Sequence, residues 1–421
     1  MLKVFTASWA LLLGMMFLMV GNGVQGTLLG IRGAIEGFST VQMSIVMSGY
    51  FVGFLFGSRM APELIRRVGH VRVFAALGSL ISAVLVLYAA IPDWMAWTVL
   101  RILIGFCFSG VYVTAESWLN NTASNENRGQ ALSLYMIVQM LGIISAQALI
   151  NFADPAGFLL FIIPSVLVSL AFAPILLSVS PAPVFGTTRS MSIRDLYDVS
   201  PLGVVGIFLM GGVFSALFGM TAVWGTEAGL SVLEISIFTG AIYFGGLIFQ
   251  YPIGWLSDRM DRRKLLVIVA LIGTASGALA VLFDLGFLAL VGVALMIGGI
   301  SNPLYSLLVA YTNDYLETDQ MAAASGGLLF VNGLGAIVGP LVIGWLMSLI
   351  GPSGFFLFII LLTATLALYA LWRMTQRAAP STSETGPFAA VSPVVSAATV
   401  EAVYSELTEQ AHETEQKDDE R

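Results

Sequence analysis

The sequence predicts an all-α membrane protein with twelve transmembrane helices, arranged as two pseudo-symmetric bundles of six. Hydrophobic residues make up 57% of the 421 residues and charged residues only 10%, which excludes a soluble protein. The apolar residues occur in stretches of about 20, the length that a membrane helix needs. The second half of the chain also repeats features of the first half at a nearly constant shift.

The apolar stretches number twelve. In the first half they cover residues 9–30, 41–59, 71–91, 94–117, 129–151 and 157–177. In the second half they cover residues 202–224, 233–252, 264–283, 287–311, 321–347 and 355–373. The first stretch is too long for a cleaved signal peptide, and a second apolar stretch follows it instead of a cleavage site. We therefore expect it to remain as a membrane helix.

Basic residues predict the orientation, because Lys and Arg in short loops stay on the cytoplasmic side of a membrane. With the amino terminus inside, 16 of the 18 basic residues are cytoplasmic. Only Arg32 is outside, and Arg101 falls within a span. This distribution predicts a multi-pass protein with both termini in the cytoplasm.

A polar linker divides the twelve spans into six and six. We expect an N-terminal bundle over 1–177, a cytoplasmic linker over 178–201 and a C-terminal bundle over 202–377. Within the linker, Ser192 is a candidate N-cap, and Ile193 with Leu196 predicts a short helix lying on the membrane surface.

Residues 378–421 form the fourth part, a tail rich in Ala, Pro, Ser, Thr and Glu. Nine of the 25 acidic residues but only two of the 18 basic residues lie after residue 380, so the tail carries the whole net charge of −7. This composition buries too little apolar surface to fold, which predicts a disordered acidic cytoplasmic tail. The alternative is a short amphipathic helix, because Val400, Val403, Leu407 and Ala411 keep helical spacing.

The two halves repeat. Residues 37–44 match residues 229–236 at a shift of 192. Further pairs at shifts of 192 or 193 are Gly53 with Gly245, Tyr112 with Tyr305, and Gly142 with Gly335. On the second span, Gly49, Gly53 and Gly57 at four-residue spacing predict a seam of close helix contact.

The loop after the eighth span contains the most informative motif, Gly-Trp-Leu-Ser-Asp-Arg-Met-Asp-Arg-Arg-Lys over residues 254–264. A glycine permits close helix approach, an aspartate can pair at a helix amino terminus, and the bases stay at the headgroups. The loop resembles the signature of the major facilitator superfamily, Gly-x-x-x-Asp-Arg-x-Gly-Arg-Arg. Asp261 stands where the family has its second glycine.

The equivalent loop of the first half, residues 62–72, departs further from this signature. Pro62 replaces the glycine and Arg66 replaces the aspartate. For both loops the alternative interpretation is simple anchoring of basic residues at the cytoplasmic surface.

The resemblance implies a set of gate residues that open and close one side of the transporter: Gly254, Asp258, Arg259, Arg262, Arg263, Glu116, Arg128 and Asp314. Asp258 is expected near the start of the fifth span, at Arg128 and Gly129, where exposed amides favour a carboxylate. Arg259 or Arg262 is expected to reach Asp314. Arg66 or Arg67 is expected to reach Glu116. We expect these contacts to be exposed and each worth under about 1 kcal/mol.

Arg101 indicates a polar cavity, because an arginine inside a span is costly unless it faces water or a partner. At helical spacing it shares one face with Ser109, Tyr112 and Glu116. The candidate cavity residues are Asn22, Gln25, Arg101, Ser109, Tyr112, Gln139, Gln147, Asn302, Tyr305 and Asn332. For Arg101 the alternative is a bracing role, and for the uncharged residues it is interhelical hydrogen bonding.

Three further strings narrow the resemblance. Arg101-Ile-Leu-Ile-Gly105 is similar to the fourth-span arginine motif of the superfamily. Residues 116–120 and 127–131 resemble the YcaD-like group of bacterial inner-membrane facilitators. The fifth-span glycine-proline motif of drug antiporters is missing, since Ser145, Ala146 and Gln147 follow Gly142. This departure weighs against drug/proton antiport.

These observations predict a secondary transporter of the cytoplasmic membrane that moves a small organic solute by alternating access between two bundles. One alternative is a proton-coupled exporter of drugs or metabolites. Another is a membrane receptor or assembly factor whose tail recruits a partner. An enzyme is the least favoured class, because no His, Asp or Glu is expected at mid-span.

The expected partners are the lipid bilayer and a small solute, for which Arg101 favours an anion. We expect a monomer without a nucleic-acid partner. No nucleotide-binding loop with its lysine occurs in the sequence. His70 and His412 are too few for a metal cluster, so we expect neither cofactor nor metal.

Overall fold

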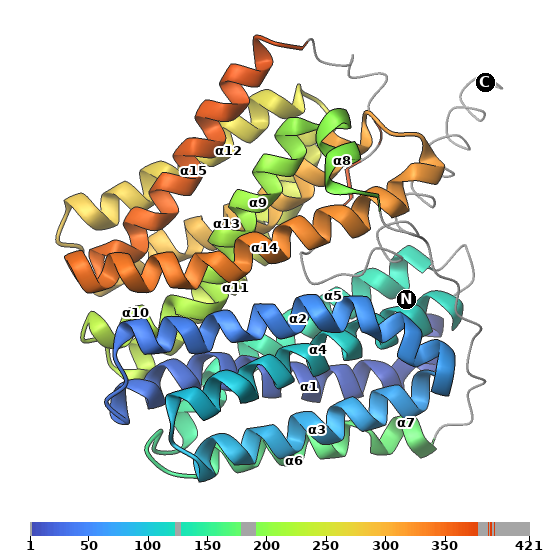
Figure 1. Cartoon of the computed structure of the whole chain (residues 1–421), viewed down its shortest axis with the longest axis vertical. Helices are drawn as coiled ribbons and strands as arrows, with labels where there is room; N and C mark the ends of the chain where they lie inside the picture. The colour runs from blue at the N-terminus through green and yellow to red at the C-terminus, as the bar shows by residue number, and fades with distance from the viewer. Residues whose placement is uncertain are drawn as a thin grey trace.

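The computed structural model describes residues 2–122, 128–177 and 191–377, together with Gly386, Phe388, Ala389 and Val391. Within these residues the regular structure is helical and forms two bundles, one from each half of the chain (Figure 1).

The N-terminal bundle is built from long helices that run back and forth. It comprises α1 (Leu2–Ile35), α2 (Thr40–Val68), α3 (His70–Ala90), α4 (Trp94–Thr122), α5 (Arg128–Leu149) with the 3-10 turn η2 (Ile150–Phe152), α6 (Leu159–Ala171) and α7 (Ala173–Leu177). The predicted sixth span is thus two helices, α6 and α7, which meet at Phe172.

The C-terminal bundle follows the same plan. It comprises α9 (Pro201–Ser215), the π-helix η3 (Ala216–Met220), α10 (Thr221–Glu227), α11 (Val232–Ser257), α12 (Arg262–Leu282), α13 (Phe287–Asn313), α14 (Thr318–Ile350) and α15 (Ser353–Met374). The predicted seventh span is one continuous rod made of α9, η3 and α10. Its π-helical turn inserts extra backbone into the rod, a feature that helices often show at functional sites.

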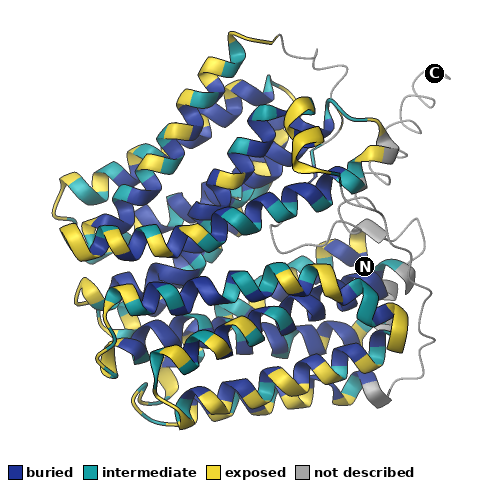
Figure 2. Ribbon diagram, viewed as in Figure 1, coloured by how far each residue is buried: buried dark blue, intermediate teal, exposed yellow. Residues whose placement is uncertain are grey.

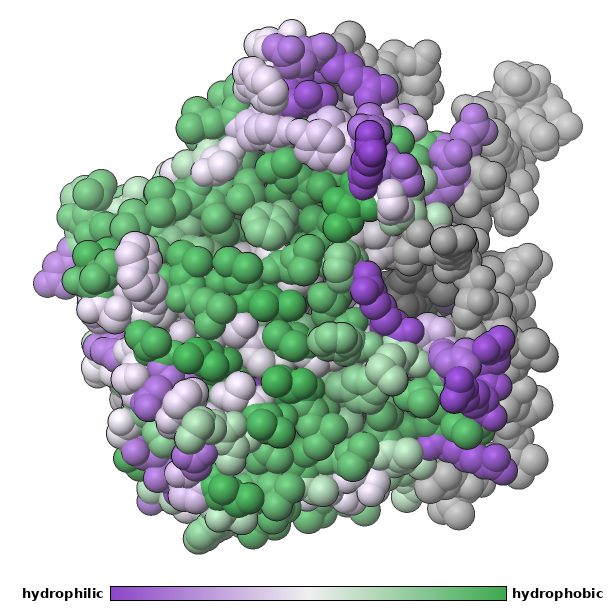
Figure 3. All heavy atoms as spheres, viewed as in Figure 1, coloured by the Kyte–Doolittle hydropathy of each residue, from purple (hydrophilic) through white to green (hydrophobic). Residues whose placement is uncertain are grey.

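The twelve predicted spans are confirmed. Among the described residues, eleven helices are long and apolar enough to cross a membrane, and the shorter apolar segment Leu159–Ile175 lies at the position of the predicted sixth span. Figure 3 shows hydrophobic residues over the middle of the molecule and hydrophilic residues gathered toward the helix ends. Large apolar side chains such as Val99 and Leu368 are exposed on the outside of the bundles, as expected where lipid replaces water. The buried residues face the bundle interiors and the boundary between bundles (Figure 2).

The repeated sequence motif forms the same turn in both bundles. Gly37 and Gly229 both have positive φ, +76° and +74°, a conformation that glycine adopts without strain. Two residues later, Ser39 and Ser231 each cap the next helix through a complete capping box. The motif is therefore repeated because each half starts its second long helix in the same way.

The glycines repeated between the two halves, Gly53 and Gly245, have the same structural role. A Cβ on Gly53 would lie 1.8 Å from the carbonyl oxygen of Ile102, and a Cβ on Gly245 would lie 2.1 Å from that of Leu295. The predicted seam on α2 is confirmed, because Gly49, Gly53 and Gly57 all face the α4 backbone. In each half, glycine lets two helices pack at backbone contact.

The linker helix differs from its prediction. Ser192 caps α8 (Ile193–Val199), as expected, and its side chain accepts a hydrogen bond from the Asp195 amide at 3.2 Å. Leu196 is fully buried and packs at Gly327 of α14, whereas Ile193 is exposed. The helix therefore packs on the C-terminal bundle through Leu196, because Gly327 of α14 leaves room for that side chain.

We call the end of the molecule that carries Arg262, Asp314 and Gly386 the tail end. The end that carries Gly37 and Gly229 is the far end. Between the bundles, α2 runs along α14 and α1 packs on α10 (Figure 1). The interface between bundles is where the candidate site lies.

Candidate functional site

A central cavity of about 90 Å³ lies between the two bundles. Helices α1, α2, α4 and α5 line it from one side, and α9, η3, α10, α11 and α13 line it from the other. Six predicted cavity residues line it: Asn22, Gln25, Arg101, Tyr112, Gln139 and Asn302. The volume is enough for several water molecules.

Arg101 carries the charge of this cavity. Its side chain is 2% exposed. One terminal nitrogen donates to Gln25 Oε1, and the other lies 3.0 Å from the sulfur of Met47. Its Nε has no hydrogen-bond partner among the described residues. The described lining includes neither Asp nor Glu, so no acid in the cavity wall neutralises the guanidinium.

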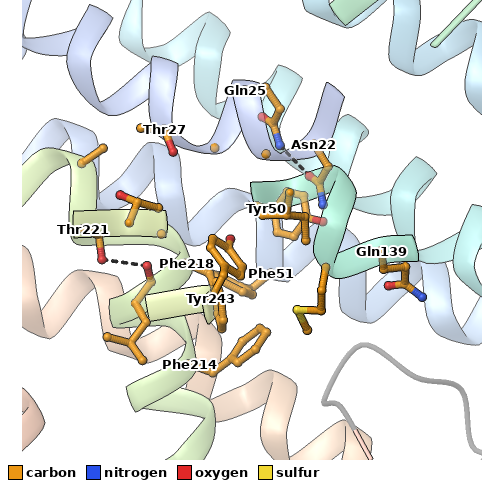
Figure 4. Close-up of a pocket in the computed structure, with 18 of the residues that line it drawn as sticks. Asn22, Gln25, Thr27, Tyr50, Phe51, Gln139, Phe214, Phe218, Thr221 and Tyr243 are labelled. Atoms are coloured by element: carbon orange, nitrogen blue, oxygen red, sulfur yellow. Dashed lines mark hydrogen bonds between the residues drawn. The ribbon is translucent and has the colours of Figure 1, made fainter. Parts of the chain in front are cut away.

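A ladder of hydrogen bonds holds Arg101 in place. Gln25 Nε2 donates to Asn22 Oδ1 at 3.0 Å, and Asn22 Nδ2 donates to the Tyr112 hydroxyl at 3.0 Å. Figure 4 shows Asn22 and Gln25 side by side on α1 with this bond between them. The ladder links α4 to α1 and back to α4, which fixes the rotamers of the polar wall.

Aromatic side chains form the other walls, and they were not among the residues predicted from the sequence. Tyr50 and Phe51 come from the N-terminal bundle, and Phe214, Phe218 and Tyr243 from the C-terminal bundle (Figure 4). The guanidinium carbon of Arg101 lies 5.1 Å from the centre of the Tyr50 ring, in cation–π contact. One signal was available, since Phe51 falls on Tyr243 at the repeat shift of 192. Phe218 gave no signal because it lies in the π-helix.

Four predicted cavity residues lie outside the central cavity. Ser109 is buried beside Gly57, and Tyr305 is buried within the C-terminal bundle. Gln147 accepts a hydrogen bond from Thr27 at 3.1 Å, which joins α5 to α1. Asn332 lines a neighbouring hollow of about 30 Å³ and donates to the Ile207 carbonyl at 3.4 Å. Ser109, Tyr305 and Gln147 are therefore buried in packing contacts. The hollow at Asn332 shares Tyr50, Phe51 and Phe214 with the central cavity.

The bundles meet tightly at the far end. A Cβ on Gly30 of α1 would lie 2.6 Å from the Cβ of Ala222 on α10. Thr40 donates a hydrogen bond to Glu227, and Ser44 packs directly on Gly344 of α14. These contacts close the far end of the interface.

The tail end has a second cavity, of about 580 Å³, between α5 on one side and α11 and α13 on the other. Ser133, Met136 and Ile137 line it from α5. Asn302 and Met140 line both this cavity and the central one, so the two spaces are neighbours. The interface is thus packed at the far end and hollow at the tail end.

At the tail end Arg262 pairs with Asp314. The sequence predicted that either Arg259 or Arg262 would form this pair. Contrary to the prediction the pair is buried, with both side chains 3% exposed. Arg262 also donates to the Ala310 carbonyl and to the Gly386 carbonyl. Burial raises the pKa of Asp314 to about 6, against the opposing effect of the Arg262 charge.

Comparison with known proteins identifies the family. The sequence pattern of the Major Facilitator Superfamily matches the chain in two overlapping stretches, residues 11–242 and 204–407. The chain belongs to the major facilitator superfamily. It is therefore a membrane transporter, with a small-molecule substrate and a lipid environment.

Named relatives come from the YcaD-like group of this superfamily. The uncharacterized MFS-type transporter YE1530 of Yersinia enterocolitica is 27% identical over 388 residues, covering 90% of this chain and 97% of the relative. YcaD of Escherichia fergusonii is 28% identical over 356 residues, covering 82% and 91%. YfkF of Bacillus subtilis is 27% identical over 360 residues, covering 83% and 90%.

Solved structures of superfamily transporters share the fold. The nucleoside transporter NupG superposes with a TM-score of 0.69 at 14% identity, covering 88% of this chain and 98% of NupG. A bacterial homolog of the human lysosomal transporter Spinster, in an inward-facing and unoccupied conformation, superposes with a TM-score of 0.71 at 14% identity, covering 90% and 99%. At this identity the likeness concerns the fold.

The superfamily signature loop, residues 254–264, departs from the consensus at Asp261, and the structure shows what this residue does. Its carboxylate accepts from the Arg263 amide at 2.9 Å and so caps α12. It also pairs with the Arg263 guanidinium at 3.0 Å. The capping carboxylate starts α12 at the position where the superfamily consensus has a turn glycine.

The other signature residues have different neighbours. Asp258 accepts a hydrogen bond from the Phe388 amide at 2.8 Å and lies 3.7 Å from Arg262. Gly254 faces the Phe388 ring. Arg259 stacks on Trp255, with 4.2 Å between guanidinium carbon and ring centre, and does not pair with Asp314. The side chain of Arg128 lies outside the described residues, so a contact between Asp258 and the start of α5 stays a prediction.

The first-half loop does not form the predicted pair with Glu116. Arg66 and Arg67 both bond Glu63 at 2.6 Å and are 66% and 71% exposed. Glu116 is fully buried on α4, where the Tyr135 hydroxyl lies 3.4 Å from it. An exposed arginine pairs with the carboxylate one helical turn away rather than with one buried in the bundle.

Proposed function

We propose that this chain is a secondary active transporter that carries a small organic anion between the two bundles by alternating access. The single observation that carries the proposal is Arg101, a buried and permanently charged group that faces a cavity without an acid in its described lining. Such a charge is costly unless a partner compensates it. A carboxylate or phosphate suits the planar donor fork of arginine.

The free Nε of Arg101 supports this proposal further. Gln25 and Met47 already engage the two terminal nitrogens, and the sulfur of a thioether is a weak acceptor. An anion that enters the cavity can replace this weak acceptor. It therefore improves the hydrogen bonding of a guanidinium that its described protein partners leave undersatisfied.

The aromatic walls favour a flat or apolar body on this anion. Tyr50 and Phe51 face Phe214, Phe218 and Tyr243 across the boundary between bundles. Rings from both halves can sandwich a planar group at centroid distances of about 4.5–7 Å. A substrate of this kind contacts both bundles at once, as alternating access requires.

The tail end is proposed to face the cytoplasm. Arg59, Arg66 and Arg67 end α2 there, and Arg262 and Arg263 begin α12 there, while Arg32 lies near the far end of α1. The positive-inside rule then assigns the tail end to the cytoplasm of a bacterial inner membrane. In that orientation the packed far end and the hollow tail end support an inward-facing state. We also propose that the transporter acts as a monomer.

A thermal-shift screen of the purified protein tests the substrate class. Small organic acids, phosphates, sugars, amines and drugs are compared, and the expected hits are aromatic or apolar carboxylates or phosphates. Hits are then tested for transport in liposomes. Stabilisation by a hydrophobic cation that binds wild type and Arg101→Gln equally well contradicts the proposal.

Two substitutions separate binding from bracing. Arg101→Gln is expected to weaken anion affinity about tenfold to a hundredfold, the loss of one charge-assisted hydrogen bond. Arg101→Lys keeps the positive charge but removes the planar pair of donors, so the affinity for the anion should fall severalfold while the protein stays stable. Gln147→Ala is the bracing control: it removes a buried contact between α5 and α1 outside the cavity. Reduced stability with unchanged affinity in Arg101→Lys means that Arg101 only braces the bundle.

Proton-coupled export is the second candidate function, because Glu116 is a buried carboxylate on a membrane helix. In this case transport depends on a pH gradient and Glu116→Gln removes that dependence. Transport that is equally fast with and without the gradient excludes this candidate.

A further inference from the structure

Four residues of the tail bind the tail end of the C-terminal bundle: Gly386, Phe388, Ala389 and Val391. We call them the docking segment. Its backbone makes hydrogen bonds to three side chains of the C-terminal bundle, two of which are predicted gate residues. The Gly386 amide donates to Asp314 at 3.2 Å, and the Phe388 amide donates to Asp258 at 2.8 Å. The Val391 amide and carbonyl both bond the Ser306 hydroxyl, at 3.0 and 2.8 Å.

The docking segment also buries apolar surface. The Phe388 ring packs directly on Gly254: a Cβ on this glycine would lie 2.7 Å from Cδ1 of the ring. Ala389 and Val391 are 2% and 3% exposed. A tail that was expected to be solvated therefore has a fitted site, in which the signature glycine makes room for an aromatic ring.

The residues that hold the docking segment are those expected to form the gate. Gly254, Asp258, Arg262 and Asp314 all contact it, and Arg262 donates to the Gly386 carbonyl. Phe388 and Val391 form part of the wall of the 580 Å³ cavity. Closing the tail end requires α5 to approach α11 across this cavity, and the docking segment occupies one side of it.

We propose that the docking segment is an intramolecular blocking peptide, which binds the gate surface of α11 and α13 and holds the tail-end cavity open. The block rests on the proposed alternating-access function, because it arrests the cycle in one of its two states. The segment must leave Asp258 before that carboxylate can engage α5. Its release therefore controls how often the transporter cycles.

Disulfide trapping tests the docking. In a Cys107→Ala background of the full chain, Ser306→Cys/Val391→Cys is oxidised and the remaining thiols are counted with a maleimide reagent. The two backbones are close enough for a disulfide because the Val391 peptide groups bond the Ser306 side chain directly. The matched control is Ser301→Cys/Val391→Cys, five residues earlier on α13. Cross-linking of the first pair alone supports docking; no cross-link, or equal cross-linking of both pairs, overturns it.

A distance measurement tests the block itself. Spin labels at Ser133→Cys on α5 and Tyr251→Cys on α11 report the width of the cavity in the purified protein. In the full chain we expect one long distance. Truncation after Arg377 should add a shorter one, with a shift of roughly tenfold in the ratio of open to closed molecules. An unchanged distance distribution overturns the block.

Point variants cover the case in which truncation impairs folding. Phe388→Asp places a charge at Gly254 and should reproduce the short distance in an otherwise full-length chain. Val395→Asp, beyond the docking segment, should leave the distances of the full chain unchanged. A long distance alone in Phe388→Asp overturns the block. No substrate is used in any of these measurements, so their failure is separate from a failure to find anion transport.

Discussion

The two bundles form the same turn at the far end and different loops at the tail end. At the far end Gly37 and Gly229 have φ values 2° apart, and each precedes a complete serine capping box. At the tail end, α2 passes into α3 through one residue, Gly69 at φ +87°. The corresponding residue of the second half, Asp261, caps α12 instead.

The charged residues of these two loops differ as well. Arg66 and Arg67 point outward and pair with Glu63 on their own helix. Arg262 lies inside the protein and pairs with Asp314 of a neighbouring helix. The repeat therefore preserves what each bundle needs to pack and diverges where one bundle carries the proposed gate. Four predictions test this comparison, from the largest expected effect on the free energy of unfolding to the smallest.

Arg262→Gln should destabilise the protein by about 3 kcal/mol, because it leaves the buried Asp314 carboxylate without its cation. The comparison variant in the first loop, Arg67→Gln, should cost less than about 1 kcal/mol, since the Arg67–Glu63 pair is exposed. Thermal unfolding of both variants in detergent measures the difference. Equal losses would show that the two loops play the same structural role.

Gly53→Ala and Gly245→Ala should each cost about 2 kcal/mol, because the new methyl group overlaps a backbone carbonyl of the facing helix. Gly240→Ala is the control, since no atom lies within 4 Å of its Cβ position on α11. Melting temperatures of the three variants sharpen the comparison. A large loss in one half only would contradict equivalent glycine seams.

Lowering the pH from 7 to 5 should stabilise the protein by about 1 kcal/mol through Asp314. The folded protein holds its pKa near 6, above the ordinary 3.8, so the folded state takes up the proton first. Burial raises this pKa, as does Asp258 on α11, while Arg262 and the Gly386 amide lower it. The stabilisation is complete below about pH 3.8 and is lost as the pH rises through 6.

Asp314→Asn should remove this part of the pH dependence, as melting temperatures across a pH series would show. The same slope in wild type and variant would assign the effect to another group. Because the Gly386 amide favours the charged form of Asp314, we also expect the docking segment to dissociate more readily below pH 6.

Asp258→Asn should change stability least, because the side chain is 42% exposed and its ion pair to Arg262 is 3.7 Å long. Its effect should appear in transport, which we expect to fall while expression and melting temperature remain nearly unchanged. Arg66→Asn, at the matching position of the first loop, should leave transport intact. Normal transport by Asp258→Asn would show that this aspartate does not hold the gate.

The sequence alone was sufficient to predict the twelve helices, the two bundles and the repeat. Lipid excludes unpaired backbone groups, so a long apolar stretch has essentially one structure available to it. The repeated Gly-x-Ser motif has an equally local cause, because positive φ and helix capping involve only neighbouring residues. Arg101 was predictable for the same reason, since a charge within an apolar stretch stands out without any knowledge of its neighbours.

Only the tertiary structure determined which polar residues share a cavity. Gln25 and Gln147 are alike in sequence, yet one bonds Arg101 and the other joins α5 to α1. The rotation of each helix about its axis decides this, and that rotation depends on packing against several partners at once. The π-helix also decides that Phe218 lines the cavity, because it changes the rotation of the following residues about the helix axis. The sequence contains no local pattern that predicts this change. Burial of Arg262 and docking of Phe388 likewise depend on surfaces made by helices far apart in the chain, which composition cannot reveal.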